Sequence, residues 1–315
     1  MEKNKLGNTE IYVSKLCYGS LTLGPLQGCL SPKDGGDLLK HGYDKGINFV
    51  DTAELYGTYP HIAASLKGIK REDIVIATKS YAYSATTAEK SLKKAFDEMK
   101  VDYIDIFLLH EQESQYTLRG HQEAMEYFIK MKEKGYIKAL GISTHHIAAI
   151  RDTLTMKEIE VLHPIVNIAG LGIQDGNIDE MLLQLEKAYK AGKGIYGMKP
   201  LGGGNLLRSF KECLEFVLDI PLLHSIAIGM KTAKEIDINS SILEKGIDDF
   251  TLDEEMLADK ALNIAHWCEK CGNCVFACSH EALSIQNDQL KVDYSKCVLC
   301  GYCSKYCPHF CIKVV

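Results

Sequence analysis

The sequence has no long apolar run: none of its 315 residues lies in a stretch approaching the roughly 20 uninterrupted apolar residues that a membrane-spanning helix needs. Its first residues, MEKNKLGNTEIYV, also lack the apolar core of a secretory signal. An excess of basic residues is absent too, because 36 Lys and Arg face 42 Asp and Glu and the formal net charge is -6. These features disfavour a membrane or a nucleic acid as partner and predict a soluble cytoplasmic protein.

Cysteine is scarce in the body of the chain, where only Cys17, Cys29 and Cys213 occur, and the other cysteines all lie between Cys268 and Cys311. Evenly spread cysteines in a short secreted chain indicate disulfide bonds, whereas a dense cluster after a cysteine-poor body indicates metal binding. We therefore expect two domains. The first spans residues 1–250, and the second, which includes a connector, spans residues 251–315.

Short apolar segments alternate with segments of helical periodicity through the first domain. A hairpin is expected at residues 5–18, turning at Gly7, Asn8 and Thr9. The strand candidates lie at residues 16–19, 47–51, 73–78, 103–109, 138–142, 161–168, 194–198 and 222–228. Eight strands that alternate with helices predict an α/β fold, a (β/α)8 TIM barrel. A doubly wound sheet is the alternative, but no glycine-rich dinucleotide turn follows the first strand.

Three helices are marked by apolar stripes at helical spacing. Thr86 and Glu89 form a predicted capping box beside the stripe within residues 88–99. The second stripe, within residues 124–131, is followed by Gly135, and the third, within residues 178–189, by Gly192. Glycine at such positions favours a helix end. Core packing is the expected role of the apolar residues in these stripes.

Four polar side chains end or follow predicted strands. The segment INFVDTAELYG at residues 47–57 places Asp51 at a strand end and Tyr56 five residues later. Lys79 ends the next strand candidate, and His110 follows the one after it. Because the carboxyl ends of barrel strands meet at one mouth, these four residues are candidate catalytic residues. The structural alternative is a buried Asp51–Lys79 ion pair, with His110 and Tyr56 as packing residues.

These residue types suit proton donation to a carbonyl oxygen while hydride arrives from another molecule. A tyrosine hydroxyl has a pKa near 10, so a nearby cation is needed to favour its phenolate. At about 4 Å and an effective dielectric constant near 20, Lys79 would contribute on the order of 4 kcal/mol, before phenolate desolvation and the opposing Asp51 are subtracted. We expect Tyr56 as the acid, Asp51 keeping Lys79 charged, and His110 orienting the substrate oxygen or sharing in proton transfer.

The segment DTAELYG, the Lys of IVIATKS and the His of DIFLLHE resemble the catalytic tetrad of the aldo/keto reductase superfamily, and the resemblance extends to about residue 245. It implies a (β/α)8 barrel that reduces small carbonyl compounds with NADPH. It also implies cofactor contacts by Ser143, Thr144, Asn167, Met198, Lys199, Pro200, Leu201, Gly202, Gly229, Lys231, Thr232 and Asn239.

Several of these positions depart from the family pattern. Thr144 stands for an asparagine, Asn167 for a glutamine, Met198 for an aromatic residue that stacks on the nicotinamide, and Ile238 for an acid. Lys231 at the adenosine end could meet a 2′-phosphate, as could Lys234, which favours NADPH over NADH. The loops that close over substrate in the family are short here, so the mouth is either open or covered by another segment.

The second domain contains the pattern C-x-x-C-x-x-C-x-x-x-C twice. Three thiolates at three-residue steps bind three corners of a cubane, and in two-cluster ferredoxins the fourth ligand comes from the other run. Zinc, the competing metal, uses paired C-x-x-C units with a longer spacer. The predicted ligands are Cys268, Cys271, Cys274 and Cys307 for one [4Fe-4S] cluster and Cys297, Cys300, Cys303 and Cys278 for the other. The chain thus resembles the aldo/keto reductase branch that carries a bacterial 2[4Fe-4S] ferredoxin domain.

Three functions are compatible with these motifs. The first is NAD(P)H-dependent carbonyl reduction, coupled in an unknown way to the clusters. Nicotinamide delivers two electrons as hydride and each cluster takes one, so direct exchange would need a converter such as a flavin. In the second, a redox partner protein feeds electrons through the clusters to a substrate or flavin in the barrel. The third, a non-enzymatic redox sensor, is disfavoured by the intact tetrad.

Overall fold

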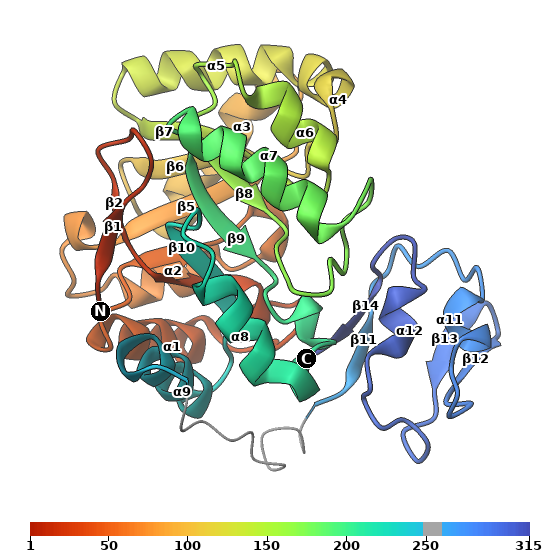
Figure 1. The fold of residues 1–315 in the computed structure, drawn as a ribbon. Coiled ribbons are helices and arrows are strands. Elements are labelled where there is room, and N and C mark those ends of the chain that lie inside the picture. The colour runs from red at the N-terminus through yellow and green to blue at the C-terminus, as the bar shows by residue number, and fades with distance from the viewer. Residues whose placement is uncertain (248–259) are drawn as a thin grey trace.

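The computed structural model describes residues 1–247 and 260–315. Eight parallel strands close into a barrel, in which the last strand pairs with the first (Figure 1). This architecture confirms the predicted TIM barrel. The barrel strands are β3 (Leu16–Gly19), β4 (Phe49–Asp51), β5 (Val75–Ser80), β6 (Ile104–Leu109), β7 (Ile137–Thr144), β8 (Val161–Pro164), β9 (Gly194–Met198) and β10 (Ser225–Gly229).

The strand predicted at residues 161–168 is shorter in the structure and ends at Pro164. The reason is a turn that Asn167 closes beyond it. The Asn167 side chain donates to the Leu171 carbonyl at 2.9 Å and accepts from the Leu171 N–H at 2.8 Å. A side chain that bonds its own loop in this way competes with a sheet ladder, so the extended run stops early.

Helices surround the barrel and follow the strands in turn (Figure 1). Their apolar stripes face the strands, as the spacing predicted, and Ala88, Leu92, Ala95 and Met99 are all buried on one helix. The helices are α1 (Pro32–Asp44), α2 (Tyr59–Ser65), α3 (Ala85–Met99), α4 (Gln115–Gly120), α5 (Gln122–Glu133), α6 (Ile147–Thr153), α7 (Ile178–Lys190), α8 (Phe210–Leu218) and α9 (Ala233–Lys245).

The predicted cap of α3 is wrong by two residues. Ser84, not Thr86, is the N-cap: its hydroxyl accepts from the Thr87 N–H at 3.2 Å. The Thr87 hydroxyl accepts from the Ser84 N–H at 3.0 Å and so takes the reciprocal position that we expected of Glu89. A threonine at this third helical position can replace the glutamate of the usual capping box because its hydroxyl also accepts a backbone bond.

A short hairpin covers the amino end of the barrel. It consists of β1 (Lys3–Lys5) and β2 (Tyr12–Ser14), so the predicted hairpin is present but begins at Lys3 and ends at Ser14 instead of spanning residues 5–18. The turn between them packs against the amino end of β9 so closely that a Cβ on Gly7 would lie 2.3 Å from the Gly194 nitrogen. Gly7 also has a φ of +58°, so glycine is required there on both counts.

The C-terminal region, residues 260–315, is a small domain with two similar halves (Figure 1). Each half runs strand, short helix, strand. The elements are β11 (Leu262–Ile264), α11 (Asn273–Phe276), β12 (Leu283–Gln286), β13 (Gln289–Val292), α12 (Tyr302–Lys305) and β14 (Ile312–Val314). The predicted boundary at residues 250 and 251, and most of the predicted connector, lie outside the described residues.

Among the helices that the structure describes, none has the length and apolar character that crossing a bilayer requires.

The small domain packs against the carboxyl end of the barrel, where β14 lies beside the 3-10 turn η4 (Gly202–Gly204). Asn205 donates to the Ile312 carbonyl at 3.0 Å, and Arg208 donates to the Val298 carbonyl at 2.7 Å. The contact at Gly301 is tight, since a Cβ there would lie 2.1 Å from the Asn205 carbonyl oxygen. Of the two alternatives for the mouth, the structure shows cover by another segment.

Candidate functional site

A buried ion pair stands at the carboxyl ends of β4 and β5. The Lys79 ammonium donates to both carboxylate oxygens of Asp51, at 2.8 and 2.6 Å, and to the Thr52 carbonyl at 2.7 Å. Asp51 and Lys79 are only 4% and 1% exposed. All three donors of the ammonium are therefore used, and the cation is fixed in place.

Two further side chains that the sequence analysis missed hold Asp51 from the opposite wall. The Tyr196 hydroxyl of β9 donates to the Asp51 carboxylate at 2.9 Å, and the His163 Nε2 of β8 lies 3.6 Å from it. Burial raises the pKa of Tyr196 well above its ordinary value and lowers the pKa of His163 to about 4. Both groups are therefore neutral at pH 7. Inward alternation along β8 and β9 was the available sequence signal.

Tyr56 and His110 meet above this pair. Tyr56 ends the 3-10 turn η2 (Glu54–Tyr56), and its ring centroid lies 5.0 Å from the Lys79 Nζ and 5.8 Å from the His110 ring. His110 also stacks on Tyr81 at 4.5 Å. Burial, together with the charge of Lys79, lowers the pKa of His110 well below its usual value, so the imidazole is neutral. The structure thus brings all four predicted catalytic residues together.

The expected lowering of the Tyr56 pKa is wrong for this state of the protein. Burial raises the pKa of Tyr56 well above 10, and the nearby Asp51 carboxylate adds to the rise. The physical reason is that Asp51 offsets the charge of Lys79, so the cation does not overcome phenolate desolvation. Tyr56 consequently holds its proton at neutral pH.

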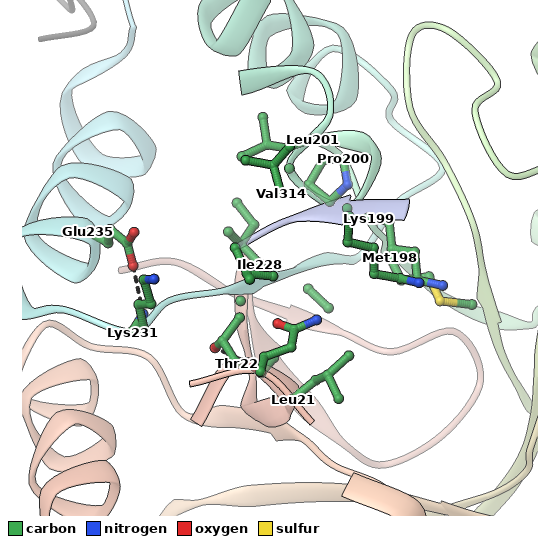
Figure 2. A pocket seen from close by; sticks show the side chains of 18 of the residues that line it. Leu21, Thr22, Met198, Lys199, Pro200, Leu201, Ile228, Lys231, Glu235 and Val314 are labelled. Atoms are coloured by element: carbon green, nitrogen blue, oxygen red, sulfur yellow. Dashed lines mark hydrogen bonds between the residues drawn. The ribbon is translucent and has the colours of Figure 1, made fainter. Parts of the chain in front are cut away.

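A cavity of about 190 Å³ opens beside these residues, and we call it the mouth cavity. Asp51, Tyr56 and His163 line its floor, and the C-terminal Lys313, Val314 and Val315 line its rim. Seven of the predicted cofactor residues line it: Met198, Lys199, Pro200, Leu201, Gly229, Lys231 and Asn239. Figure 2 shows Met198 and Lys199 on one side and Lys231 on the other.

The other five predicted cofactor residues do not line the mouth cavity: Ser143, Thr144, Asn167, Gly202 and Thr232. The side chains of the four that are not glycine form hydrogen bonds with nearby backbone. The Ser143 hydroxyl accepts from the Glu111 N–H at 2.9 Å, and the Thr232 hydroxyl caps α9 by accepting from the Glu235 N–H at 3.2 Å. Polar residues at strand ends and helix starts often serve the loop itself, which sequence alone does not distinguish from ligand binding.

The far end of the mouth cavity contains Glu235 and Lys260, two charged residues that the sequence analysis did not single out. Glu235 accepts from the Lys231 backbone N–H and from the Lys260 ammonium, each at 2.6 Å (Figure 2 shows the first bond). The neighbouring Asn239 donates to the Glu235 carbonyl, but its Oδ1 is buried without a partner among the described residues. A buried acceptor without a partner at a cavity wall fits an N–H donor of a ligand.

The eight cysteines predicted as ligands face two separate hollows in the small domain. Cys268, Cys271, Cys274 and Cys307 line one, and Cys278, Cys297, Cys300 and Cys303 line the other. In each hollow three cysteines come from one run and the fourth comes from the other run. Among the described residues, no three His, Cys, Asp or Glu side chains converge closely enough for a single metal ion.

Comparison with known proteins covers both parts of the chain. Residues 15–216 match the aldo/keto reductase family, and residues 290–313 match the 4Fe-4S binding domain. L-galactose dehydrogenase of Arabidopsis thaliana is 23% identical over 300 residues, covering 82% of this chain and 93% of that protein. The 6-dehydroglucose reductase of Novosphingobium aromaticivorans is 27% identical over 223 residues, covering 64% of this chain and 69% of its own length.

Solved structures agree on the fold. An aldo-keto reductase from Bacillus halodurans in its holo form gives a TM-score of 0.65 at 21% identity, covering 81% of this chain and 93% of that one. An aldo/keto reductase from Brucella melitensis gives a TM-score of 0.59 at 20% identity, covering 81% and 96%. Because the matched model spans most of the barrel, this chain is an oxidoreductase that belongs to the aldo/keto reductase family and carries a C-terminal 4Fe-4S binding domain.

Proposed function

We propose that the protein reduces a small carbonyl compound with NADPH, with Tyr56 as the proton donor. The observation that carries this proposal is the convergence of Tyr56, His110 and the buried Asp51–Lys79 pair, of which Tyr56 and Asp51 line the mouth cavity. The nicotinamide, when bound, supplies a hydride to the carbonyl carbon. The chain's own residues then have to supply one proton to the carbonyl oxygen.

Tyr56 supplies that proton. Its raised pKa keeps the hydroxyl protonated until negative charge develops on the substrate oxygen. Lys79, fixed by Asp51, stabilises the phenolate that remains, and water returns the proton afterwards. His110 is neutral, so it can donate a hydrogen bond to the substrate oxygen without placing a second cation beside Lys79.

The seven lining residues at the mouth cavity support the choice of NADPH. Asn239 offers an unused buried acceptor for an adenine amino group, and Lys231 lies at the same end of the mouth cavity. Ser143, Thr144 and Asn167 are bonded to nearby backbone, so the proposal assigns the nicotinamide end chiefly to Met198 and Lys199.

We propose further that the small domain holds two [4Fe-4S] clusters. The two hollows, each with three cysteines of one run and one of the other, match the ligand sharing of two-cluster ferredoxins. All twelve cysteines are free of disulfide bonds, which suits the reducing cytoplasm that we propose as its location.

Replacing Tyr56 with Phe tests the reductase proposal. Y56F should lower kcat for aldehyde reduction by about 100-fold or more, since a positioned general acid contributes about 10²–10⁴-fold. NADPH affinity and the visible iron-sulfur spectrum should stay unchanged. The matched control is Y116F, which removes the same hydroxyl from an exposed residue on α4. Turnover by Y56F at the wild-type rate would refute the assignment.

A second candidate function is supply of electrons to the barrel through the clusters, from a redox partner protein. It is favoured by one observation: the segment after Cys307 brings Lys313 to the mouth cavity, and its Phe310 ring lies 5.2 Å from the Lys199 ammonium. The test uses anaerobic protein with iron and flavin quantified, to which NADPH is added without a carbonyl substrate. Bleaching of the visible iron-sulfur absorption supports electron exchange between barrel and clusters, whereas clusters that stay oxidised while an aldehyde consumes NADPH mean that carbonyl reduction proceeds without them.

A further inference from the structure

Two lysines from different domains meet at the rim of the mouth cavity. Lys199 follows β9 in the barrel, and Lys313 belongs to β14 of the small domain. Their ammonium groups lie 5.2 and 5.0 Å from the centroid of the same ring, that of Phe310. Both side chains line the mouth cavity together with Tyr56.

Neither ammonium group has a carboxylate within ion-pair distance among the described residues. Lys199 donates to the neutral His145 Nε2 at 2.6 Å, and Lys313 donates to the Phe310 carbonyl at 2.9 Å. An ammonium has three donors, so each lysine has unused ones. The Glu111 carboxylate acts to raise the pKa of both lysines from a distance, but the hydrogen bond that it accepts comes from the Tyr81 hydroxyl.

The rest of the mouth cavity does not supply the missing negative charge. Its charged lining side chains are Asp51, Glu235, Lys199, Lys231, Lys260 and Lys313, and the main-chain oxygen of Val315 accepts from the Ala261 N–H at 3.0 Å. Asp51 is bonded to Lys79, and Glu235 is bonded to Lys260. The positive charge of Lys199 and Lys313 is therefore in excess at the end of the mouth cavity that holds the tetrad.

This arrangement is unfavourable when the mouth cavity is empty. Burial and the charge of Lys313 lower the pKa of Lys199 to about 7, and burial lowers that of Lys313. Two cations brought together in a partly dry site repel each other unless an anion lies between them. The charge of Lys199 also contributes to lowering the pKa of His110.

We infer that Lys199 and Lys313 form an anion site that binds a carboxylate on the carbonyl substrate. This inference rests on the proposed reductase function and narrows its substrate class to oxo acids, whose aldehyde or ketone would lie at Tyr56. The phosphates of NADPH offer the same anionic chemistry, and the experiment below separates the two sources.

The turnover arm compares substrates that differ only in charge, with NADPH constant. The pairs are para-carboxybenzaldehyde with para-formylbenzamide, and glyoxylate with glyoxylamide. Wild-type protein should favour the acid in at least one pair by about 10–100-fold in kcat/KM, as charged hydrogen bonds imply.

The acid-to-amide ratio of kcat/KM should fall about tenfold or more in K199M and in K313M, and K313R should restore much of it. K291M, which neutralises an exposed lysine of the small domain, should leave the ratio unchanged. Equal ratios in wild type and K313M would overturn the inference.

The binding arm needs no turnover, so it separates failure of this inference from failure of the reductase proposal. Calorimetry measures benzoate and benzamide binding to the cluster-loaded protein, with and without saturating NADP⁺. Tighter binding of benzoate that persists with NADP⁺ and is lost in K313M supports a substrate anion site. Displacement of benzoate by NADP⁺, with weaker NADP⁺ binding in K313M, would assign the lysines to the cofactor phosphates and overturn the inference.

Discussion

Asp51 is the residue that links the side chains at the floor of the mouth cavity. Its carboxylate accepts from the Lys79 ammonium and the Tyr196 hydroxyl, and the Nε2 of His163 lies 3.6 Å from it. These partners come from three strands, so one buried charge links opposite walls of the barrel. A buried ion pair is weak support for stability in itself, but removing one partner leaves an uncompensated charge.

Lys79→Met should therefore destabilise the protein by about 3–5 kcal/mol, because Asp51 would stay buried without its cation. The double variant D51N/K79M should recover much of that loss, since the asparagine oxygen can still accept from Tyr196. Denaturant unfolding measures both. K93M is the control: it breaks an exposed pair with Asp97, 72% and 60% exposed, and should cost under about 1 kcal/mol. A double variant no more stable than K79M would contradict this account.

The low pKa of Lys199 predicts a pH dependence for anionic substrates. Its pKa falls from 10.5 to about 7, so Lys199 is charged below pH 7 and neutral above it in the free protein. Because kcat/KM reports the free enzyme, kcat/KM for para-carboxybenzaldehyde should fall as pH rises through about 7. The charged or titratable groups near Lys199 are Lys79 on β5, His110 and Glu111 after β6, His145 after β7 and Lys313 on β14.

The direction of this pH dependence can be checked in the same experiment. A bound carboxylate favours charged Lys199, so the midpoint for kcat should lie above that for kcat/KM. K199R keeps its charge across this range and should remove the fall. If kcat/KM for the amide substrate falls with rising pH in parallel with that for the acid, the group that titrates is not Lys199.

Residues at strand ends could be identified from the sequence, whereas their partners on other strands could not. Asp51, Lys79 and His110 each terminate an apolar run, which is visible in one dimension. His163 and Tyr196 contact Asp51 only because the sheet closes into a barrel. Lys313 reaches the mouth cavity only because the small domain docks there, and no local pattern specifies that docking.

At the scale of single elements, the sequence located the barrel strands within a few residues, and two of the errors occurred where side chains bond nearby backbone. The run predicted at residues 161–168 stops at Pro164, since Asn167 closes a turn. The N-cap of α3 is Ser84 instead of the predicted Thr86, because Thr87 and not Glu89 completes the capping box. Such choices depend on hydrogen-bond geometry that several nearby hydroxyls could satisfy.

Ser84→Ala tests the corrected cap. Loss of the hydroxyl leaves the Thr87 N–H without its partner, so the free energy of unfolding should fall by about 1 kcal/mol. Thr86→Ala is the matched control, because Thr86 is exposed inside the first turn and should change stability by less than about 0.5 kcal/mol. Denaturant unfolding of both variants decides between the two positions, and a larger loss in T86A would restore the original prediction.

At the scale of the whole molecule, the two domains share the mouth cavity. The barrel supplies the tetrad, and the small domain supplies Lys313, Val314 and Val315 at the rim. The barrel has its own large apolar core, while the small domain buries only a small apolar cluster around its cysteines. The small domain should accordingly depend on its metal for folding, whereas the barrel should not.

Removing iron should therefore change substrate selection more than catalysis. In protein treated anaerobically with a chelator, the small domain should unfold and withdraw Lys313 from the anion site, while the tetrad stays on the barrel strands. The acid-to-amide ratio of kcat/KM should fall about tenfold, as expected for loss of one charged hydrogen bond, and reduction of the uncharged aldehyde should persist. Limited proteolysis checks that residues 260–315 have become accessible. If they are cleaved while the ratio stays at its wild-type value, Lys313 does not act on the substrate and the small domain serves another purpose.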